Sequence, residues 1–216
     1  MEAPIKEKLD NFFKQYKIQK FRTKEILIRA DDDPGGVFYL TEGIVKMYAI
    51  SSSGEEVVIN TFKPVSFFPM SWILNDVVSH YYFEALNEVT VWKAPKEVFL
   101  KFLKGEPEVL FDLVKRIYGG LEGYFSRMEY LMSGNAMSRL ITEILIYARR
   151  FGKKGNNNIV VNLKLTEKDL ASQTGIARET VSRELTKLKD KGLISFESNT
   201  LIVNNLLELE SELITD

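Results

Sequence analysis

Short apolar runs separated by turn-forming residues occupy the first ninety residues of the chain. Between about Ile18 and Val91 the apolar runs are two to four residues long, and the segments between them are rich in Gly, Pro, Asp and Ser. The runs and the turns alternate at 26–28, 33–36, 37–40, 42–43, 44–45, 51–54 and 57–59. Many short strands at this spacing are typical of a small antiparallel barrel or jelly roll. We therefore predict an antiparallel β-roll over residues 1–106.

A long amphipathic helix is predicted from Pro107, because the missing N–H of proline costs nothing in the first turn of a helix. Its apolar positions recur at alternating spacings of four and three, at Leu110, Val114, Ile117, Leu121, Tyr124, Met128 and Leu131. This pattern is typical of a helix that pairs with another, most simply with its own copy in a parallel dimer. The alternative is an amphipathic helix that lies on its own domain. We assign residues 107–134 to a dimerisation helix.

Three glycines lie inside this predicted helix, at Gly119, Gly120 and Gly123. Each glycine in a helix interior costs up to about 1 kcal/mol relative to alanine. Their presence is consistent with a close approach of another chain, a ligand-facing surface or a hinge.

Residues 135–216 have a different pattern, which predicts several helices, two of them joined by a tight turn. A break at 133–135 precedes a helix from Met137 to Phe151, and the polar segment from Gly152 to Asn158 is predicted to be a flexible connector. The segment from 165 to 196 then divides into a helix, a turn, a second helix and a strand. Gly175 permits the positive φ that such a turn needs, so the spacing predicts a helix-turn-helix.

The sequence also indicates where the first helix begins and which face of the second helix is buried. Thr166 and Asp169 form a capping-box pattern at the start of the first helix. The inward stripe of the second helix consists of Ile176, Val181, Leu185 and Leu188. After it, 193–196 and 200–203 are predicted to form a β-hairpin wing around a turn at 197–199.

The inward stripe leaves one polar face near the start of the second helix, with Arg178, Glu179, Ser182 and Arg183. Arg can donate two hydrogen bonds to guanine O6 and N7, and Glu can accept from cytosine N4. These residues are the predicted base readers. The predicted phosphate contacts are Thr166, Thr180, Lys187, Lys189 and Lys191. The alternative is a surface helix with scattered charges.

The charge distribution favours a nucleic-acid partner. The 216-residue chain has a net charge of −1. Residues 135–194 hold twelve Lys/Arg and six Asp/Glu, a net +6, so the remainder carries −7. A basic segment on an otherwise acidic chain is the electrostatic footprint of a domain that meets phosphate, and the alternative is a solvated face.

The residue types that are scarce exclude several kinds of chemistry. The chain has no cysteine and one histidine, His80. Disulfides, iron–sulfur clusters, thiolate zinc sites and thiol redox sensing are therefore excluded, and a single histidine argues against haem. A metal-dependent jelly-roll enzyme, the enzymatic alternative, needs several convergent ligands. We predict no metal, no cofactor and no catalytic residue.

No stretch of the sequence approaches the roughly 18 consecutive apolar residues that span a bilayer. The start of the chain is polar and acidic, unlike the apolar core of a signal peptide. We expect a cytoplasmic protein without a membrane partner.

The segment RETVSREL at 178–185, followed by KGLI at 191–194, resembles the recognition helix of the CRP/FNR family of bacterial regulators. The resemblance covers nearly the whole chain and implies an α+β fold: an antiparallel β-roll of the cyclic-nucleotide-binding type, a long dimerisation helix and a C-terminal winged helix-turn-helix. It further implies a homodimer that binds double-stranded DNA at a palindromic TGTGA-like site, with Arg178, Glu179 and Arg183 reading bases and RNA polymerase as a further partner. Ala177 departs from the polar residue usual before this helix and forfeits an N-cap of about 1 kcal/mol.

The sensor region departs from the nucleotide-binding members of that family. Pro69-Met70 stands where they have Gly-Glu for the ribose, and Ser79-His80 stands where they have Arg-Ser for the phosphate. A buried phosphate without a cation or backbone N–H groups is poorly stabilised. We therefore predict that neither cyclic AMP nor cyclic GMP is the effector, and the sequence leaves the effector unidentified or absent.

Aromatic residues cluster near the family's ligand positions. The candidate effector pocket comprises Phe68, Met70, Trp72, His80, Tyr81, Tyr124 and Phe125. Side chains fill such clusters more often than ligands do, so a packed core is the favoured interpretation and an apolar ligand the alternative. A further alternative is a ligand-binding module whose DNA binding has degenerated, which the retained Arg178, Glu179 and Arg183 oppose.

Overall fold

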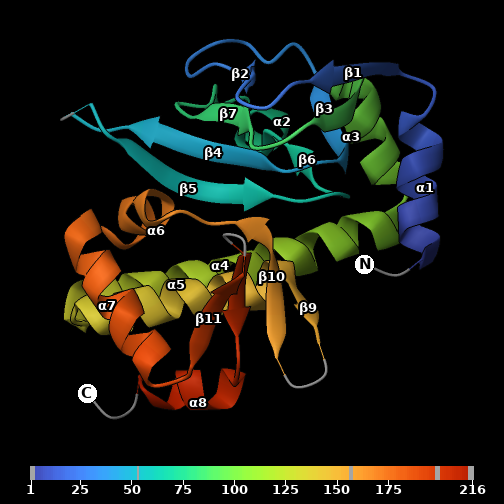
Figure 1. The fold of residues 1–216 in the computed structure, drawn as a ribbon. Coiled ribbons are helices and arrows are strands. Elements are labelled where there is room, and N and C mark those ends of the chain that lie inside the picture. Colours follow the sequence, from blue (N-terminus) through green and yellow to red (C-terminus); the bar gives the residue numbers. More distant parts are fainter. Residues whose placement is uncertain (1–2, 53, 156–157, 198–199, 214–216) are drawn as a thin grey trace. The chain divides into compact units, whose positions relative to one another are not determined.

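The computed structural model describes residues 3–52, 54–155, 158–197 and 200–213. Contacts divide the chain into two compact units, residues 1–118 and 119–216. The long helix α4 (Pro107–Ser133) contributes to both. Strands, the long helix and the helix-turn-helix follow in the expected order (Figure 1), which confirms the predicted α+β class. Because α4 belongs to both units, the functional division into residues 1–106, 107–134 and 135–216 remains a proposal.

Two antiparallel four-stranded sheets form the β-roll of the first unit. One sheet has the order β1 (Lys17–Phe21), β8 (Val89–Ala94), β3 (Val37–Glu42) and β6 (Phe67–Phe68). The other has the order β2 (Ile26–Ile28), β7 (Tyr82–Ala85), β4 (Val45–Ile50) and β5 (Glu56–Phe62). Apolar side chains from both sheets, among them Phe38, Val45 and Phe83, pack into one buried cluster. The predicted strands are thus present in two sheets, and the two sheets pack against each other through this cluster.

Two helices of this unit were not predicted. Helix α1 (Ala3–Phe13) buries Leu9, Phe12 and Phe13, and Figure 1 shows it beside α3 (Lys96–Gly105). Phe12 stacks on Phe102 of α3 with ring centroids 4.3 Å apart. Helix α2 (Met70–Asn75) interrupts the segment that was expected to be entirely β-like. Each helix is short and is stabilised by burial against distant residues, which its local pattern does not reveal.

The second unit contains five helical segments and one sheet among the described residues. Its elements after α4 are α5 (Ala136–Phe151), β9 (Gly152–Lys154), β10 (Ile159–Lys164), α6 (Glu167–Thr174), α7 (Arg178–Asp190), β11 (Ile194–Glu197), β12 (Thr200–Val203) and α8 (Leu206–Ser211). The sheet order is β11-β12-β10-β9. The predicted hairpin wing is present as β11 and β12, although residues 198 and 199 of its turn lie outside the described residues.

The prediction of a flexible connector from Gly152 to Asn158 was wrong for its first residues. Gly152–Lys154 is strand β9 and pairs antiparallel with β10. Backbone groups make this pairing, so the polar side chains of Lys153 and Lys154 do not prevent it. A Cβ at Gly152 would lie 2.1 Å from the carbonyl oxygen of Ala148, which explains the glycine at this junction. Residues 156 and 157 of the connector lie outside the described part of the chain.

Polar contacts fix the end of α4 to α5. Arg127 donates to both carboxylate oxygens of Glu143, at 2.7 and 2.6 Å, and Glu143 is 1% exposed. Burial alone would lower the pKa of Arg127, but the hydrogen bonds and charge of Glu143 raise it above its usual value. Arg139 donates to the backbone oxygens of Tyr130 and Leu131 in the last turn of α4. The end of the long helix is therefore part of the second unit.

None of the described helices is long and apolar enough to cross a membrane. Within the same described residues, no three His, Asp or Glu side chains come together as a metal site would require.

Gly43 and Gly54 allow a test of backbone constraint in the β-roll. Both have positive φ, 85° and 82°, but a Cβ at Gly43 would lie 2.2 Å from the carbonyl oxygen of Glu88, whereas one at Gly54 meets nothing within 4 Å. Gly54→Ala should lower the free energy of unfolding by about 1–2 kcal/mol from the positive φ alone. Gly43→Ala should lower it substantially more. Urea unfolding followed by circular dichroism measures both, and equal losses would contradict the steric explanation.

Candidate nucleic-acid interface

The helix-turn-helix is held by local signals and a small apolar core. Thr166 caps α6 by accepting from the N–H of Asp169, and the Asp169 side chain accepts in return from the N–H of Thr166. Helix α6 ends at Gly175, whose φ is 65°. Leu170 of α6 and Val181 of α7 are fully buried between the helices. The capping box, the left-handed turn and most of the inward stripe lie where the sequence predicted them, although Ile176 is only half-buried.

Helix α7 begins at Arg178, after an N-cap residue that provides no side-chain hydrogen bond. Ala177 has the extended φ and ψ of an N-cap, −62° and 145°, but its methyl group cannot accept from the exposed N–H groups of the first turn. As the sequence predicted, the N-terminus of α7 has no side-chain cap.

The four predicted base readers line one surface depression. Arg178, Glu179 and Arg183 are exposed and Ser182 is half-buried, and all four contribute to its wall. Arg183 donates to the hydroxyl of Thr180 at 3.3 Å. A side-chain face of this kind can donate from two guanidinium groups and accept at one carboxylate, which are the groups that base edges require.

Two further residues of this depression were not predicted from the sequence. Thr186 lies one turn after Ser182 on the same face of α7, so the helical period could have indicated it. Glu167 comes from the start of α6, and its Oε2 lies 3.2 Å from Nε of Arg178. No local pattern predicts that contact, because it depends on how the two helices cross.

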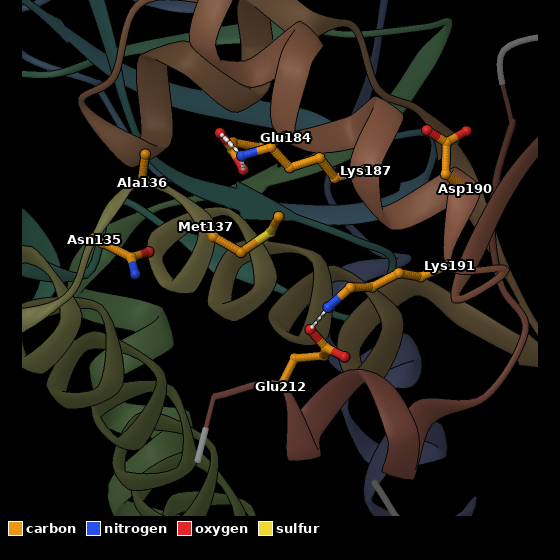
Figure 2. Close-up of a pocket in the computed structure, with 8 residues that line it drawn as sticks. All are labelled: Asn135, Ala136, Met137, Glu184, Lys187, Asp190, Lys191 and Glu212. Carbon is orange, nitrogen blue, oxygen red and sulfur yellow. Dashed lines mark hydrogen bonds and ion pairs between the residues drawn. The ribbon is translucent and has the colours of Figure 1, made fainter. Parts of the chain in front are cut away.

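The predicted phosphate contacts have different surroundings. Figure 2 shows a second depression where Lys187 pairs with Glu184 and Lys191 pairs with Glu212. Its lining residues are Asn135, Ala136, Met137, Glu184, Lys187, Asp190, Lys191 and Glu212.

The remaining three phosphate candidates do not form one cluster with these lysines. Nζ of Lys189 lies 4.8 Å from the ring centroid of Phe196 in the wing. Thr166 is engaged in its helix cap and Thr180 accepts from Arg183.

The heptad seam of α4 is exposed along its whole length. All seven predicted dimer-helix residues, Leu110, Val114, Ile117, Leu121, Tyr124, Met128 and Leu131, are between 36% and 59% exposed. A second stripe repeats every seven residues beside it and is also exposed: Phe111, Tyr118, Phe125 and Met132. The described residues therefore leave an apolar face of α4 exposed, and large exposed apolar faces are typical of interaction sites.

Comparison with known proteins identifies both parts of the chain. A family model described as a cyclic nucleotide-binding domain matches residues 18–106, and one described as a Crp-like helix-turn-helix domain matches residues 138–212. A global nitrogen regulator from Nostoc sp. (strain PCC 7120) is 26% identical over 197 residues, 90% of this chain and 88% of the relative. The chain belongs to the CRP/FNR family of transcriptional regulators.

Solved structures support the fold of this CRP/FNR regulator. A CooA mutant from Carboxydothermus hydrogenoformans has a TM-score of 0.78 and 21% identity, with 94% of this chain and 89% of that chain covered. A CRP/FNR-family regulator from Thermus thermophilus has a TM-score of 0.68 and 21% identity, with 92% and 98% covered. The chain is a DNA-binding transcriptional regulator of this family, and the jelly-roll enzyme alternative is rejected.

The β-roll of this CRP/FNR regulator shows the surroundings of the positions that depart from the nucleotide-binding pattern. Pro69 precedes α2 and Met70 begins it. The Ser79 side chain is buried, and its hydroxyl accepts from the backbone N–H of Tyr81 at 3.3 Å. His80 is exposed and bonds to the carboxylate of Asp31, which would repel a neighbouring phosphate.

The candidate effector-pocket residues of the β-roll fall into three settings. Phe68 is fully buried and stacks on Phe83 with centroids 5.2 Å apart, and Tyr81 packs against the same cluster. Met70 and Trp72 pack against a separate core cluster. His80 is on the surface. The filled-core interpretation therefore describes Phe68, while Tyr124 and Phe125 belong to the exposed face of α4 described above.

Ala177→Ser should stabilise the DNA-binding unit of the regulator by about 1 kcal/mol, because its hydroxyl can accept from the N–H of Glu179 in the first turn of α7. Thr166→Ala is the matched control at α6 and should destabilise by a similar amount. Urea unfolding monitored by helical circular dichroism measures both changes. An Ala177→Ser protein no more stable than the parent would mean that this N–H already has an equivalent partner.

Proposed function

We propose that this CRP/FNR regulator binds a palindromic, TGTGA-like DNA site as a homodimer and reads base edges with Arg178, Glu179, Ser182 and Arg183. The observation that carries the proposal is the convergence of these side chains in one exposed depression at the start of α7. A recognition helix presents its N-terminal residues to the major groove, where Arg pairs with guanine and Glu accepts from cytosine.

The exposed seam of α4 supports the homodimer. Seven apolar residues at heptad spacing bury efficiently only against a second helix with the same periodicity. An added Cβ at Gly119, Gly120 or Gly123 would meet none of the other described residues within 4 Å, which leaves room for close approach by another copy. A two-fold dimer places its two recognition helices about one DNA turn apart, near 34 Å, and so requires a palindromic site.

Phosphate contacts from Thr166, Thr180, Lys187, Lys189 and Lys191 complete the proposed interface. Lys187 and Lys191 are held by carboxylates in the free protein, so DNA binding exchanges one anionic partner for another. Each exchange contributes less net affinity than an unpaired lysine would, and the basic balance of this region supplies the general attraction.

Regulation by cyclic AMP or cyclic GMP is not part of the proposal. The His80–Asp31 pair and the absence of an arginine at the family's phosphate position disfavour a cyclic nucleotide. The effector is another molecule or none, and RNA polymerase is the proposed protein partner at the promoter. Because its target is DNA, we place the regulator in the bacterial cytoplasm.

Binding of ligand-free protein to a fluorescent TGTGA-N6-TCACA duplex, compared with a scrambled duplex over a salt series, tests this function. Selective binding is expected, with affinity for both duplexes falling as salt rises. Equal affinity for the two duplexes at moderate salt would contradict the base-reading assignment.

Two variants separate base reading from phosphate contact. Arg183→Ala should lose about 1–3 kcal/mol of discrimination at one base pair of each half-site. Lys187→Ala should weaken binding to all sequences alike and reduce the salt slope by about one. Arg183→Ala losing affinity equally for palindrome and scrambled duplex would overturn its assignment as a base reader.

Leu121→Lys tests the dimer helix. The substitution places a charge in the centre of the proposed seam, where pairing would desolvate it, so the dimer should dissociate at concentrations at which the parent is dimeric. Glu122→Lys is the matched control on the adjacent position of the same helix and should remain dimeric. Sedimentation velocity measures both, and an unchanged Leu121→Lys dimer would show that the copies associate elsewhere.

A further inference from the structure

Glu167 is the acidic residue from α6 that shares a depression with the recognition helix. Its Oε2 lies 3.2 Å from Nε of Arg178, eleven positions later in the chain. The Arg178 side chain remains 68% exposed in this contact, so the pair faces the solvent side of the helix-turn-helix. A surface pair of this kind contributes little to stability, and its location beside the base readers suggests a different role.

We propose that Glu167 is a specificity-determining residue that positions Arg178 for base reading and weakens the sequence-independent attraction of this surface for DNA. The inference rests on the proposed function, in which Arg178 reads a base. Glu167 acts through Arg178 and is therefore a positioning residue.

The geometry of the guanidinium explains the positioning. Arginine has five N–H donors in a planar fork, and Glu167 occupies the one on Nε. The edge formed by the two terminal nitrogens is left for guanine O6 and N7, which accept from two parallel donors. A long side chain that is already oriented loses less conformational freedom when it binds. Glu167 thereby favours one mode of base contact over the many that a mobile arginine could make.

The charge of Glu167 explains the selectivity. With Glu179, it places two acidic side chains in the same depression as Arg178, Arg183 and Lys187. The two carboxylates partly offset the attraction of the three cations for a DNA phosphate, whereas an amino group on a cytosine or adenine edge meets acceptors. The arrangement lowers affinity for DNA in general and raises the relative affinity for the correct base sequence.

Helix capping does not account for Glu167. The α6 N-terminus is already capped by Thr166, whose own N–H is satisfied by Asp169. A carboxylate in the first turn gains some energy from the helix dipole, but that gain does not require a partner on α7. The role of Glu167 therefore lies in its contact with Arg178.

Two substitutions at this position separate the role of the hydrogen bond from the role of the charge. Glu167→Ala removes both, whereas Glu167→Gln keeps an oxygen that can accept from Nε of Arg178 but carries no charge. Full-length protein is titrated with the palindrome, with a palindrome changed symmetrically at each base pair in turn, and with a scrambled duplex, over a salt series. Circular dichroism of each variant confirms that it is folded.

Glu167→Ala should bind the scrambled duplex several-fold more tightly, because a negative charge has left the interface. It should also lose about tenfold of the preference at the base pair read by Arg178. Glu167→Gln should bind the scrambled duplex with similarly increased affinity yet retain most of that preference. Glu208→Gln, which removes one negative charge from an exposed residue of α8, is the charge control and should leave the base preference unchanged.

A double-mutant cycle shows whether Glu167 acts through its partner. In an Arg178→Ala protein, which lacks the reader, adding Glu167→Ala should not alter the preference at any base pair. If the parent is selective and Glu167→Ala keeps every base preference, or weakens all duplexes equally, the inference is wrong. A parent protein that binds all duplexes equally would instead contradict the proposed function itself.

Discussion

The left-handed turn at Gly175 is the constraint on which the rest of the DNA-binding surface depends. With a φ of 65° at this residue, α6 ends and α7 begins three residues later. Leu170 of α6 and Val181 of α7 are both fully buried, and the start of α6 contacts the start of α7 through Glu167 and Arg178. The depression that holds Glu167 with the four candidate base readers is a consequence of this crossing.

The surface around that turn combines attraction and exclusion. Its arginines and lysines are cations of the kind that attract DNA phosphate, but carboxylates accompany several of them: Glu167 at Arg178, Glu184 at Lys187 and Glu212 at Lys191. Such pairing limits the affinity for phosphate in general, so that base contacts decide a larger share of the binding energy. A regulator that must distinguish one site among many gains from this balance.

The long helix α4 has an exposed apolar seam and a C-terminal end that is bound to α5. Its apolar seam is left open by the chain, whereas its C-terminal end is tied to α5 by the buried Arg127–Glu143 pair. Removing either partner of such a pair leaves an uncompensated buried charge, so the pair holds the end of α4 against the DNA-binding core. A partner that packs on the apolar seam would therefore contact a helix whose C-terminal end is fixed to α5 of the DNA-binding unit.

The sequence by itself determined the features that depend on local pattern. The heptad seam, the capping box at Thr166, the break before α5, the turn at Gly175 and most strands follow from residue spacing and from the conformational limits of individual residues. The resemblance at RETVSREL indicated the family for the same reason, because recognition residues lie on one short helix.

Only the tertiary structure decided the features that join distant segments. Helices α1 and α2 are stabilised by core residues far away in the chain, and β9 pairs through its backbone despite a polar sequence. The contact of Glu167 with Arg178 joins the starts of α6 and α7, and the contact of Lys191 with Glu212 joins the residues that follow α7 and α8. The physical reason is that a side chain's partners depend on how elements pack, whereas periodicity reports only which face of its own element a residue occupies.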